Sequence, residues 1–258
     1  MILEYKSIPV FYTDSGKGNA VILLHGFLEN SNMWNHFIPR LSENNRVICI
    51  DLLGHGKTGC LGYIHTMELM AEVVEAVLNH LEIKKSILIG HSMGGYVALA
   101  FAEKNPKAIS GLCLMNSTAI ADSQEKKINR DRAVIAVKQN HRTFIRMAVA
   151  NLFRPKNRII FSDKISEVIN EALQTPLQGV VAALEGMKIR KNREFLLHTR
   201  TFKKLMVIGK KDPALSYLSL IEQIKNTDVK MVEFPDGHMS HIENESKLLH
   251  EIMYFIEN

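Results

Sequence analysis

The sequence predicts an α/β fold, with a mainly parallel sheet covered by helices on both faces. Apolar runs of strand length alternate along the 258 residues with segments whose apolar residues recur at helical spacing. Most of these runs are unbroken stretches of Ile, Val and Leu, which is typical of strands buried on both faces. A long stretch near the middle of the chain is helical in pattern and contains no strand candidate. We therefore also expect a helical insertion.

Six runs are predicted as parallel strands, at residues 20–25, 46–51, 86–90, 109–115, 204–208 and 229–234. Residues 9–14 alternate in polarity and precede a glycine-containing turn, which indicates an antiparallel strand near one edge. Helices are predicted at residues 66–81, 92–104, 217–225 and 246–256. The second of these carries small residues that allow a close approach to the sheet, namely Gly94, Gly95, Ala98 and Ala102.

The insertion is expected to be a separate helical layer. Residues 1–116 and 200–258 are predicted to form the core, and residues 117–199 a helical cap over a site. Within the cap we expect two helices in residues 132–153, then helices at 166–174 and 177–187. The candidate apolar face of the first pair consists of Phe144, Met147, Ala148 and Phe153. An elaboration with its own small core, unrelated to a site, remains the alternative.

The positive charge is concentrated in the insertion. The chain has a formal charge of +5, and residues 126–158 contribute +9 of it, leaving −4 for the rest. This basic segment contains two aromatic residues and no known nucleic-acid-binding motif, which argues against nucleic-acid binding. Two interpretations stay open: the charge attracts an anionic substrate or carrier, or it belongs to solvated helix faces.

Composition excludes other classes. No run of 18 apolar residues exists, so stable membrane insertion is not expected. The first residues lack the pattern of a secretory signal. The three cysteines are an odd number without metal-ligand spacing, and Cys49 and Cys113 lie in apolar strand-like runs. These features predict a cytoplasmic protein with free thiols, whose oligomeric state the sequence leaves open.

A candidate nucleophile follows the strand at residues 86–90. Gly90-His91-Ser92-Met93-Gly94 is a Gly-x-Ser-x-Gly sequence between a buried strand and a helix of small residues. That context is typical of a nucleophile elbow, a sharp turn that exposes a serine hydroxyl at the carboxyl edge of the sheet. The following helix directs its N-terminal amides at developing negative charge.

A serine hydroxyl needs a base and an acid that orients the base. His238 follows the last predicted strand beside Gly237, and we prefer it to His241, which is expected to begin or flank the closing helix. Asp212 follows the strand at 204–208 and is the predicted acid. Asp236 is too close in sequence to His238. The remaining candidate, Asp51, is expected to tie down a turn, and His36, His65, His80, His198 and His250 are predicted at the surface.

An oxyanion hole completes the set. His25-Gly26-Phe27 follows the strand at 20–25, where Gly26 allows the backbone to present the Phe27 amide. Together with the Met93 amide it would bind the developing oxyanion, and each such donor contributes about 3–4 kcal/mol in comparable sites. The chain order of Ser92, Asp212 and His238 is the order expected of this kind of site.

These motifs together resemble the α/β-hydrolase superfamily over nearly the whole chain. The matching landmarks are His25-Gly26-Phe27, residues 51–58, Gly90-His91-Ser92-Met93-Gly94-Gly95 and Gly237-His238, with Leu53 and Thr58 departing from the family's usual proline and serine. The resemblance implies an eight-stranded, mostly parallel sheet, a cap inserted after the sixth strand, and neither metal nor organic cofactor.

The resemblance also narrows the chemistry. Haloalkane dehalogenases and epoxide hydrolases of this fold carry aspartate where this chain has Ser92. Carboxylesterases, acyl-carrier methyl-ester esterases, lactonases, carbon–carbon bond hydrolases, perhydrolases and the menaquinone-pathway lyase remain. We expect a serine hydrolase that cleaves a carboxylic ester of a small molecule through an acyl-enzyme. The alternatives are carbon–carbon cleavage, a lyase whose acidic substrate the cap arginines bind (Arg130, Arg142, Arg146, Arg154), and a ligand-binding scaffold without turnover.

Overall fold

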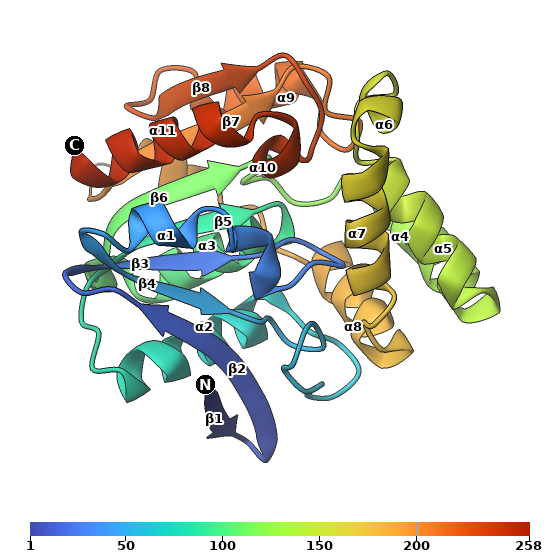
Figure 1. Cartoon of the computed structure of the whole chain (residues 1–258), viewed down its shortest axis with the longest axis horizontal. Helices are drawn as coiled ribbons and strands as arrows, with labels where there is room; N and C mark the ends of the chain where they lie inside the picture. Colours follow the sequence, from blue (N-terminus) through green and yellow to red (C-terminus); the bar gives the residue numbers. More distant parts are fainter. Residues whose placement is uncertain (200) are drawn as a thin grey trace.

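The computed structural model describes residues 1–199 and 201–258, and an eight-stranded sheet forms its centre (Figure 1). The strands are β1 (Ile2–Tyr5), β2 (Ile8–Ser15), β3 (Asn19–Leu24), β4 (Asn45–Ile50), β5 (Ser86–His91), β6 (Ile109–Met115), β7 (Lys203–Gly209) and β8 (Lys230–Phe234). Their spatial order is β1-β2-β4-β3-β5-β6-β7-β8. The pairs β1·β2 and β2·β4 are antiparallel, and the pairs from β4 to β8 are parallel.

The predicted strands are therefore present, and the sheet has the predicted mostly parallel character. The segment expected at 9–14 is β2, antiparallel and next to the edge. Strand β1 was not predicted, because its four residues are half-buried or exposed and form no apolar run.

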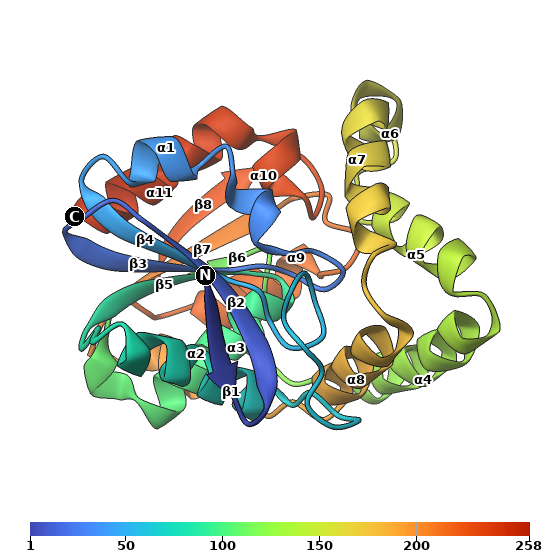
Figure 2. The same cartoon turned by 60° about the horizontal axis from the view of Figure 1, so that its bottom comes forward.

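Helices cover both faces of the sheet (Figure 2). One face carries α2 (Met67–His80), α3 (Met93–Lys104) and α9 (Tyr217–Ile224), and the other carries α1 (Ile38–Leu41) and α11 (Glu245–Glu257). Successive strand residues alternate between the two cores: Ile22 belongs to the first and Leu23 to the second. The four core helices expected from periodicity are confirmed, whereas α1 and α10 (Ser240–Glu243) are too short to show a period.

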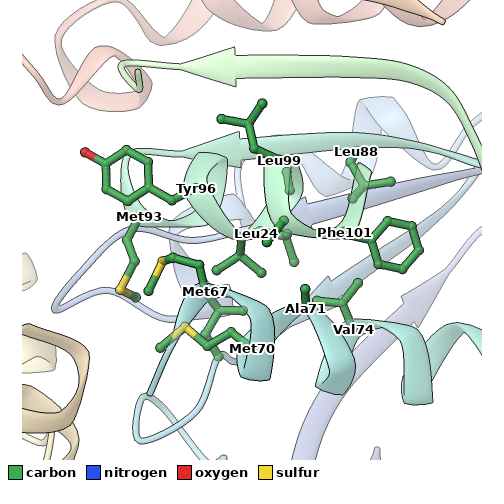
Figure 3. Close-up of a cluster of buried hydrophobic side chains, with 14 of the residues drawn as sticks. Leu24, Met67, Met70, Ala71, Val74, Leu88, Met93, Tyr96, Leu99 and Phe101 are labelled. Carbon is green, nitrogen blue, oxygen red and sulfur yellow. The ribbon is translucent and has the colours of Figure 1, made fainter. Parts of the chain in front are cut away.

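The larger core lies beneath α2 and α3. Figure 3 shows Leu24 and Leu88 from the sheet facing Met67, Met70 and other side chains of these two helices. Burial of each large apolar side chain stabilises the fold by roughly 1.5–3 kcal/mol. This packing holds α3, and therefore the turn that precedes it, in a fixed position on the sheet.

Between β6 and β7, the described residues form the short 3-10 helix Glu194–His198 and five α-helices, which confirms the helical insertion after the sixth strand. The α-helices are α4 (Gln124–Gln139), α5 (His141–Ala150), α6 (Asn157–Ile160), α7 (Ser162–Ala172) and α8 (Leu177–Lys188). Figures 1 and 2 show this cap beyond the carboxyl ends of the parallel strands. Position 200, where the second core segment was expected to begin, is outside the described residues.

Two details of the cap differ from expectation. Helix α4 begins at Gln124 rather than near residue 132, because the hydroxyl of Ser123 caps it by accepting from the Lys126 amide. Met147 is 60% exposed and does not belong to the apolar face. The buried face of α5 consists of Ile145 and Val149. Met147 is two residues from each of them, which places it on the opposite side of the helix.

Helix α8 contacts the core through backbone. A Cβ on Gly179 would lie 2.1 Å from the Gly54 carbonyl oxygen, and one on Gly186 would lie 1.7 Å from that of His65. The His65 amide donates to the Ala182 carbonyl at 2.9 Å. His65 is accordingly buried, and its predicted surface position is wrong.

In the part of the chain that is described, no helix combines the length and the apolar character needed to cross a membrane.

Candidate active site

Ser92 occupies a strained turn between β5 and α3. Its backbone angles are φ 49° and ψ −112°, a conformation that costs about 1–3 kcal/mol for a residue with a side chain. The turn is so tight that a Cβ on Gly90 would lie 2.4 Å from the Gly94 backbone, and a Cβ on Gly94 would lie 2.4 Å from the Leu24 carbonyl oxygen. The small residues of the motif are therefore required by close backbone approach.

Asp212 and His238 are paired. Nδ1 of His238 lies 2.7 Å from Oδ2 of Asp212, although the two residues stand on separate loops after β7 and β8. The other carboxylate oxygen accepts from the amides of Ala214 (2.8 Å) and Leu215 (3.1 Å). The side-chain amide of Asn116 donates to Oδ2 at 3.3 Å. These bonds fix both the carboxylate and the imidazole ring.

Electrostatics keep Asp212 ionised. Burial raises the pKa of its carboxyl group, but the charge and hydrogen bond of His238 outweigh burial and hold that pKa below its usual value. An ionised carboxylate only accepts hydrogen bonds, so Nδ1 of His238 carries the proton and donates it. Nε2 is then available to accept a proton from another group.

A cavity of about 450 Å³ brings the predicted residues together between core and cap. Its wall contains Ser92, His238 and Phe27. The remaining lining residues are His91, Tyr96, Ser123, Glu125, Lys126, Asn129, Arg130, Ala133, Leu152, Leu184, Met187, Pro213, Ala214 and Leu215. Met93 is buried as the first residue of α3, so its amide lacks an intrahelical partner.

The loop that carries Phe27 is held on both sides. The Gly26 amide donates to Oε2 of Glu29 at 2.7 Å, and Nε2 of His25 accepts from the Leu52 amide at 2.8 Å. A Cβ on Gly26 would lie 2.5 Å from Oε2 of Glu29 and 2.8 Å from Nδ1 of His91. A larger residue at this position would therefore require Glu29 or His91 to shift.

Sequence reasoning missed a buried group of three ionisable residues at the cavity, one of which, His91, lines its wall. Oε2 of Glu29 lies 2.6 Å from Nδ1 of His91, and Oε1 lies 3.4 Å from Nε2 of His241. Nε2 of His91 lies 3.0 Å from the carbonyl oxygen of His238. The available signals were the position of Glu29 just after His25-Gly26-Phe27 and that of His91 within the pentapeptide.

This group consists of an ion pair and a neutral histidine. Burial raises the pKa of Glu29, but the charge and hydrogen bond of His91 lower it to about 2. Burial lowers the pKa of His91, yet Glu29 raises it by more, so that it lies above its usual value. Burial lowers the pKa of His241 to about 3.

Two histidines and a carboxylate are also a metal-ligand set, and their ligand atoms lie within 4.8 Å of one another. The 2.6 Å contact between Glu29 and His91 is, however, a charge-assisted hydrogen bond, and the Gly26 amide donates to the same oxygen. Oε2 of Glu29 is thus engaged by His91 and Gly26, whereas Oε1 of Glu29 and Nδ1 of His241 are buried without a hydrogen-bond partner among the described residues. We assign no metal to the group.

The other candidates lie outside this centre. Asp51 accepts from the amides of Ser31 and Lys57, each at 2.8 Å, and ties down a turn as expected. Asp236 pairs with Arg154 at 3.2 Å. Among the cap arginines considered for an acidic substrate, Arg130 lines the cavity, whereas Arg142 and Arg146 are exposed on α5.

Comparison with known proteins agrees with this architecture. Residues 19–245 match the family described as having the alpha/beta hydrolase fold. The chain belongs to the α/β-hydrolase fold family.

Individual proteins of known name resemble the chain at moderate identity. A dihydrolipoyllysine-residue acetyltransferase component of an acetoin cleaving system from Pseudomonas putida is 28% identical over 93% of this chain and 64% of its own length. A 2-hydroxy-6-oxononadienedioate/2-hydroxy-6-oxononatrienedioate hydrolase from Paraburkholderia xenovorans is 29% identical over 70% of this chain and 63% of its own. The chain thus spans less than two thirds of these relatives.

A solved structure matches the chain over a larger share of both lengths. A thermophilic esterase from Thermogutta terrifontis, solved with malate bound, is 28% identical with a TM-score of 0.90 and covers 100% of this chain and 97% of its own. The two chains therefore have the same fold over nearly their whole length.

Proposed function

We propose that this α/β hydrolase cleaves carboxylic esters through an acyl-enzyme on Ser92. The 2.7 Å pair of His238 and Asp212, with His238 and Ser92 both on the wall of one cavity, carries the proposal. The Thermogutta esterase, alike over the whole chain, supports the ester class.

The proposed reaction begins when Ser92 Oγ attacks the ester carbonyl carbon. Nε2 of His238 accepts the serine proton, and the amides of Phe27 and Met93 hold the oxyanion. Collapse of the tetrahedral intermediate breaks the bond to the alcohol, which leaves with the proton from His238. Water then attacks the acyl-enzyme, His238 accepts its proton, and release of the acid returns that proton to Ser92. Asp212 keeps the ring oriented and stabilises the imidazolium in both halves.

Carbon–carbon bond hydrolysis is the second candidate, because the same serine, base and amides serve it and the Paraburkholderia relative is named for such a substrate. Ester and carbon–carbon substrates offered to one preparation separate the two. A lyase acting on an acidic substrate would depend on cap arginines, and Arg130 is the one of the four that lines the cavity.

The test compares the parent protein with Ser92→Ala on p-nitrophenyl esters of graded chain length. We expect the variant to lose turnover to the background rate while its thermal unfolding stays unchanged or improves, because alanine removes a hydroxyl without adding atoms to the turn. Retained turnover in Ser92→Ala would end the proposal. A fluorophosphonate probe gives a second readout: labelling requires an activated hydroxyl, and a ligand-binding scaffold would not react at Ser92.

A further inference from the structure

The cap wall of the cavity carries a lysine that faces the candidate catalytic loops. Lys126 lies in the first turn of α4 and is half-buried. Its Nζ donates to the Ala214 carbonyl at 3.3 Å, and the amide of Ala214 in turn donates to Asp212 at 2.8 Å. The ammonium group is thus anchored at the loop that carries Asp212, and the residue lines the same cavity as Ser92.

Within the described part of the chain, this ammonium forms no direct ion pair with a carboxylate. Among residues 1–199 and 201–258, no carboxylate oxygen lies within 4.0 Å of Nζ of Lys126. The nearby acid Asp122 is committed elsewhere: its two oxygens bind Nε of Arg130 at 2.9 Å and Nη1 of Arg190 at 2.6 Å. Burial lowers the pKa of Lys126, and the charges of Arg190 and Arg130 lower it further, while those of Asp122 and Asp212 oppose the shift.

Glu125 does not neutralise it. This carboxylate also lines the cavity, but adjacent residues on a helix do not face each other, and Glu125 is exposed to water. Lys126 and Arg130 line this end of the cavity, and Arg190 lies behind them on Asp122. Of the two buried carboxylates near Lys126, Asp122 is bound to the two arginines and Asp212 to His238. Glu125 nevertheless limits the excess, which favours a singly charged anion over a doubly charged phosphate.

We propose that Lys126 binds a carboxylate of the substrate, so that the preferred esters carry an ionised carboxylate remote from the bond that is cleaved. The proposal rests on the ester hydrolysis proposed above. A lysine offers three donors and no acceptor, and an ion pair formed in a cavity partly shielded from water gains more than one at the surface. The acid released would carry the same distal carboxylate and would bind as an inhibitor.

The experiment uses monomethyl esters of linear dicarboxylic acids, from succinate to suberate, each beside the methyl ester whose distal carboxylate is replaced by a neutral primary amide. Ester cleavage is followed by proton release at constant pH. We expect the parent protein to favour the carboxylate ester at one or more chain lengths. Lys126→Gln should lower kcat/KM for that ester by about tenfold or more, mainly through KM, because a charge-assisted hydrogen bond is lost.

Two controls make the result specific. The amide ester should change less than twofold in Lys126→Gln, and Lys127→Gln, the adjacent lysine that is absent from the cavity wall, should leave both esters unchanged. Lys126→Glu should reverse the preference toward the amide ester. Thermal unfolding of each variant checks that the fold is intact.

Other outcomes overturn the proposal. Equal loss on both esters in Lys126→Gln, an equal effect of Lys127→Gln, or no carboxylate preference in the parent protein would each show that Lys126 does not recognise the anion, while turnover of the amide esters would leave the ester function standing. Failure of the parent protein to cleave any of the esters would overturn both proposals together.

Discussion

Both ring nitrogens of His91 are donors, because Nδ1 lies 2.6 Å from a carboxylate oxygen of Glu29 and Nε2 lies 3.0 Å from the carbonyl oxygen of His238. Neither oxygen can donate, so the geometry requires an imidazolium. The buried pair of Glu29 and His91 thus connects three segments: the loop of Gly26 and Phe27, the turn of Ser92, and the loop of His238.

Removing the charge of Glu29 should loosen all three segments. Glu29→Gln leaves His91 without its carboxylate in the interior, and we expect the free energy of unfolding to fall by about 3 kcal/mol. We also expect kcat to fall while KM changes little, because the Phe27 amide and His238 move relative to Ser92. A double-mutant cycle with His91→Gln, followed by urea unfolding, measures the coupling. Additive effects of the two substitutions would contradict a direct interaction.

Asp212→Asn should separate orientation from proton transfer. The amide can still contact His238 but favours the wrong tautomer, so we expect kcat on p-nitrophenyl esters to fall by about 10⁴-fold. Thermal unfolding should change far less, since the contacts to the Ala214 and Leu215 amides can persist. A decrease below tenfold would mean that His238 does not depend on this partner.

Acid should destabilise the fold through buried histidines. Burial lowers the pKa of His55 to about 3 and that of His65 to about 4. Below the ordinary histidine pKa of about 6.5, both residues are protonated in the unfolded chain but stay neutral in the folded protein. The fold therefore loses stability as the pH falls from 6.5 toward the two lowered pKa values. At pH 5 each residue contributes about 2 kcal/mol of this loss.

Urea unfolding at pH 7 and pH 5 measures the difference, and His55→Gln should reduce it. His91 acts with the opposite sign: its raised pKa adds stability below 6.5 that disappears as the pH rises through the raised value. If His55→Gln left the difference in stability between pH 5 and pH 7 unchanged, the native fold would not oppose protonation of His55.

Gly186→Ala tests the contact between α8 and the core. In an isolated helix this change is favourable by about 1 kcal/mol, but here the new Cβ would lie 1.7 Å from the His65 carbonyl oxygen. We therefore expect the melting temperature to fall by several degrees. Glu185→Ala, one position away and lacking only a surface pair with Lys188, should change it little. An increase for Gly186→Ala would mean that α8 is not held against residue 65.

The sequence by itself determined the elements that repeat a local pattern. Buried parallel strands appear as continuous apolar runs, α2 and α11 appear as apolar faces, and the Gly-x-Ser-x-Gly turn appears between a strand and a helix of small residues. The order of Ser92, Asp212 and His238 along the chain was also readable, because each follows a predicted strand and parallel strands end at one edge of the sheet.

Tertiary structure decided the rest. The contact of Glu29 with His91 joins residues that are 62 positions apart in the sequence. The contact of Asp212 with His238 joins two loops whose contacting residues are 26 positions apart. The buried position of His65 and the place of the Lys126 ammonium on the cavity wall depend likewise on how α8 and α4 dock. Periodicity records which face of an element is buried, since the chain repeats that face every few residues. A single contact between distant loops leaves no repeating pattern in the sequence. The distance between its two residues is set by how whole helices and strands dock.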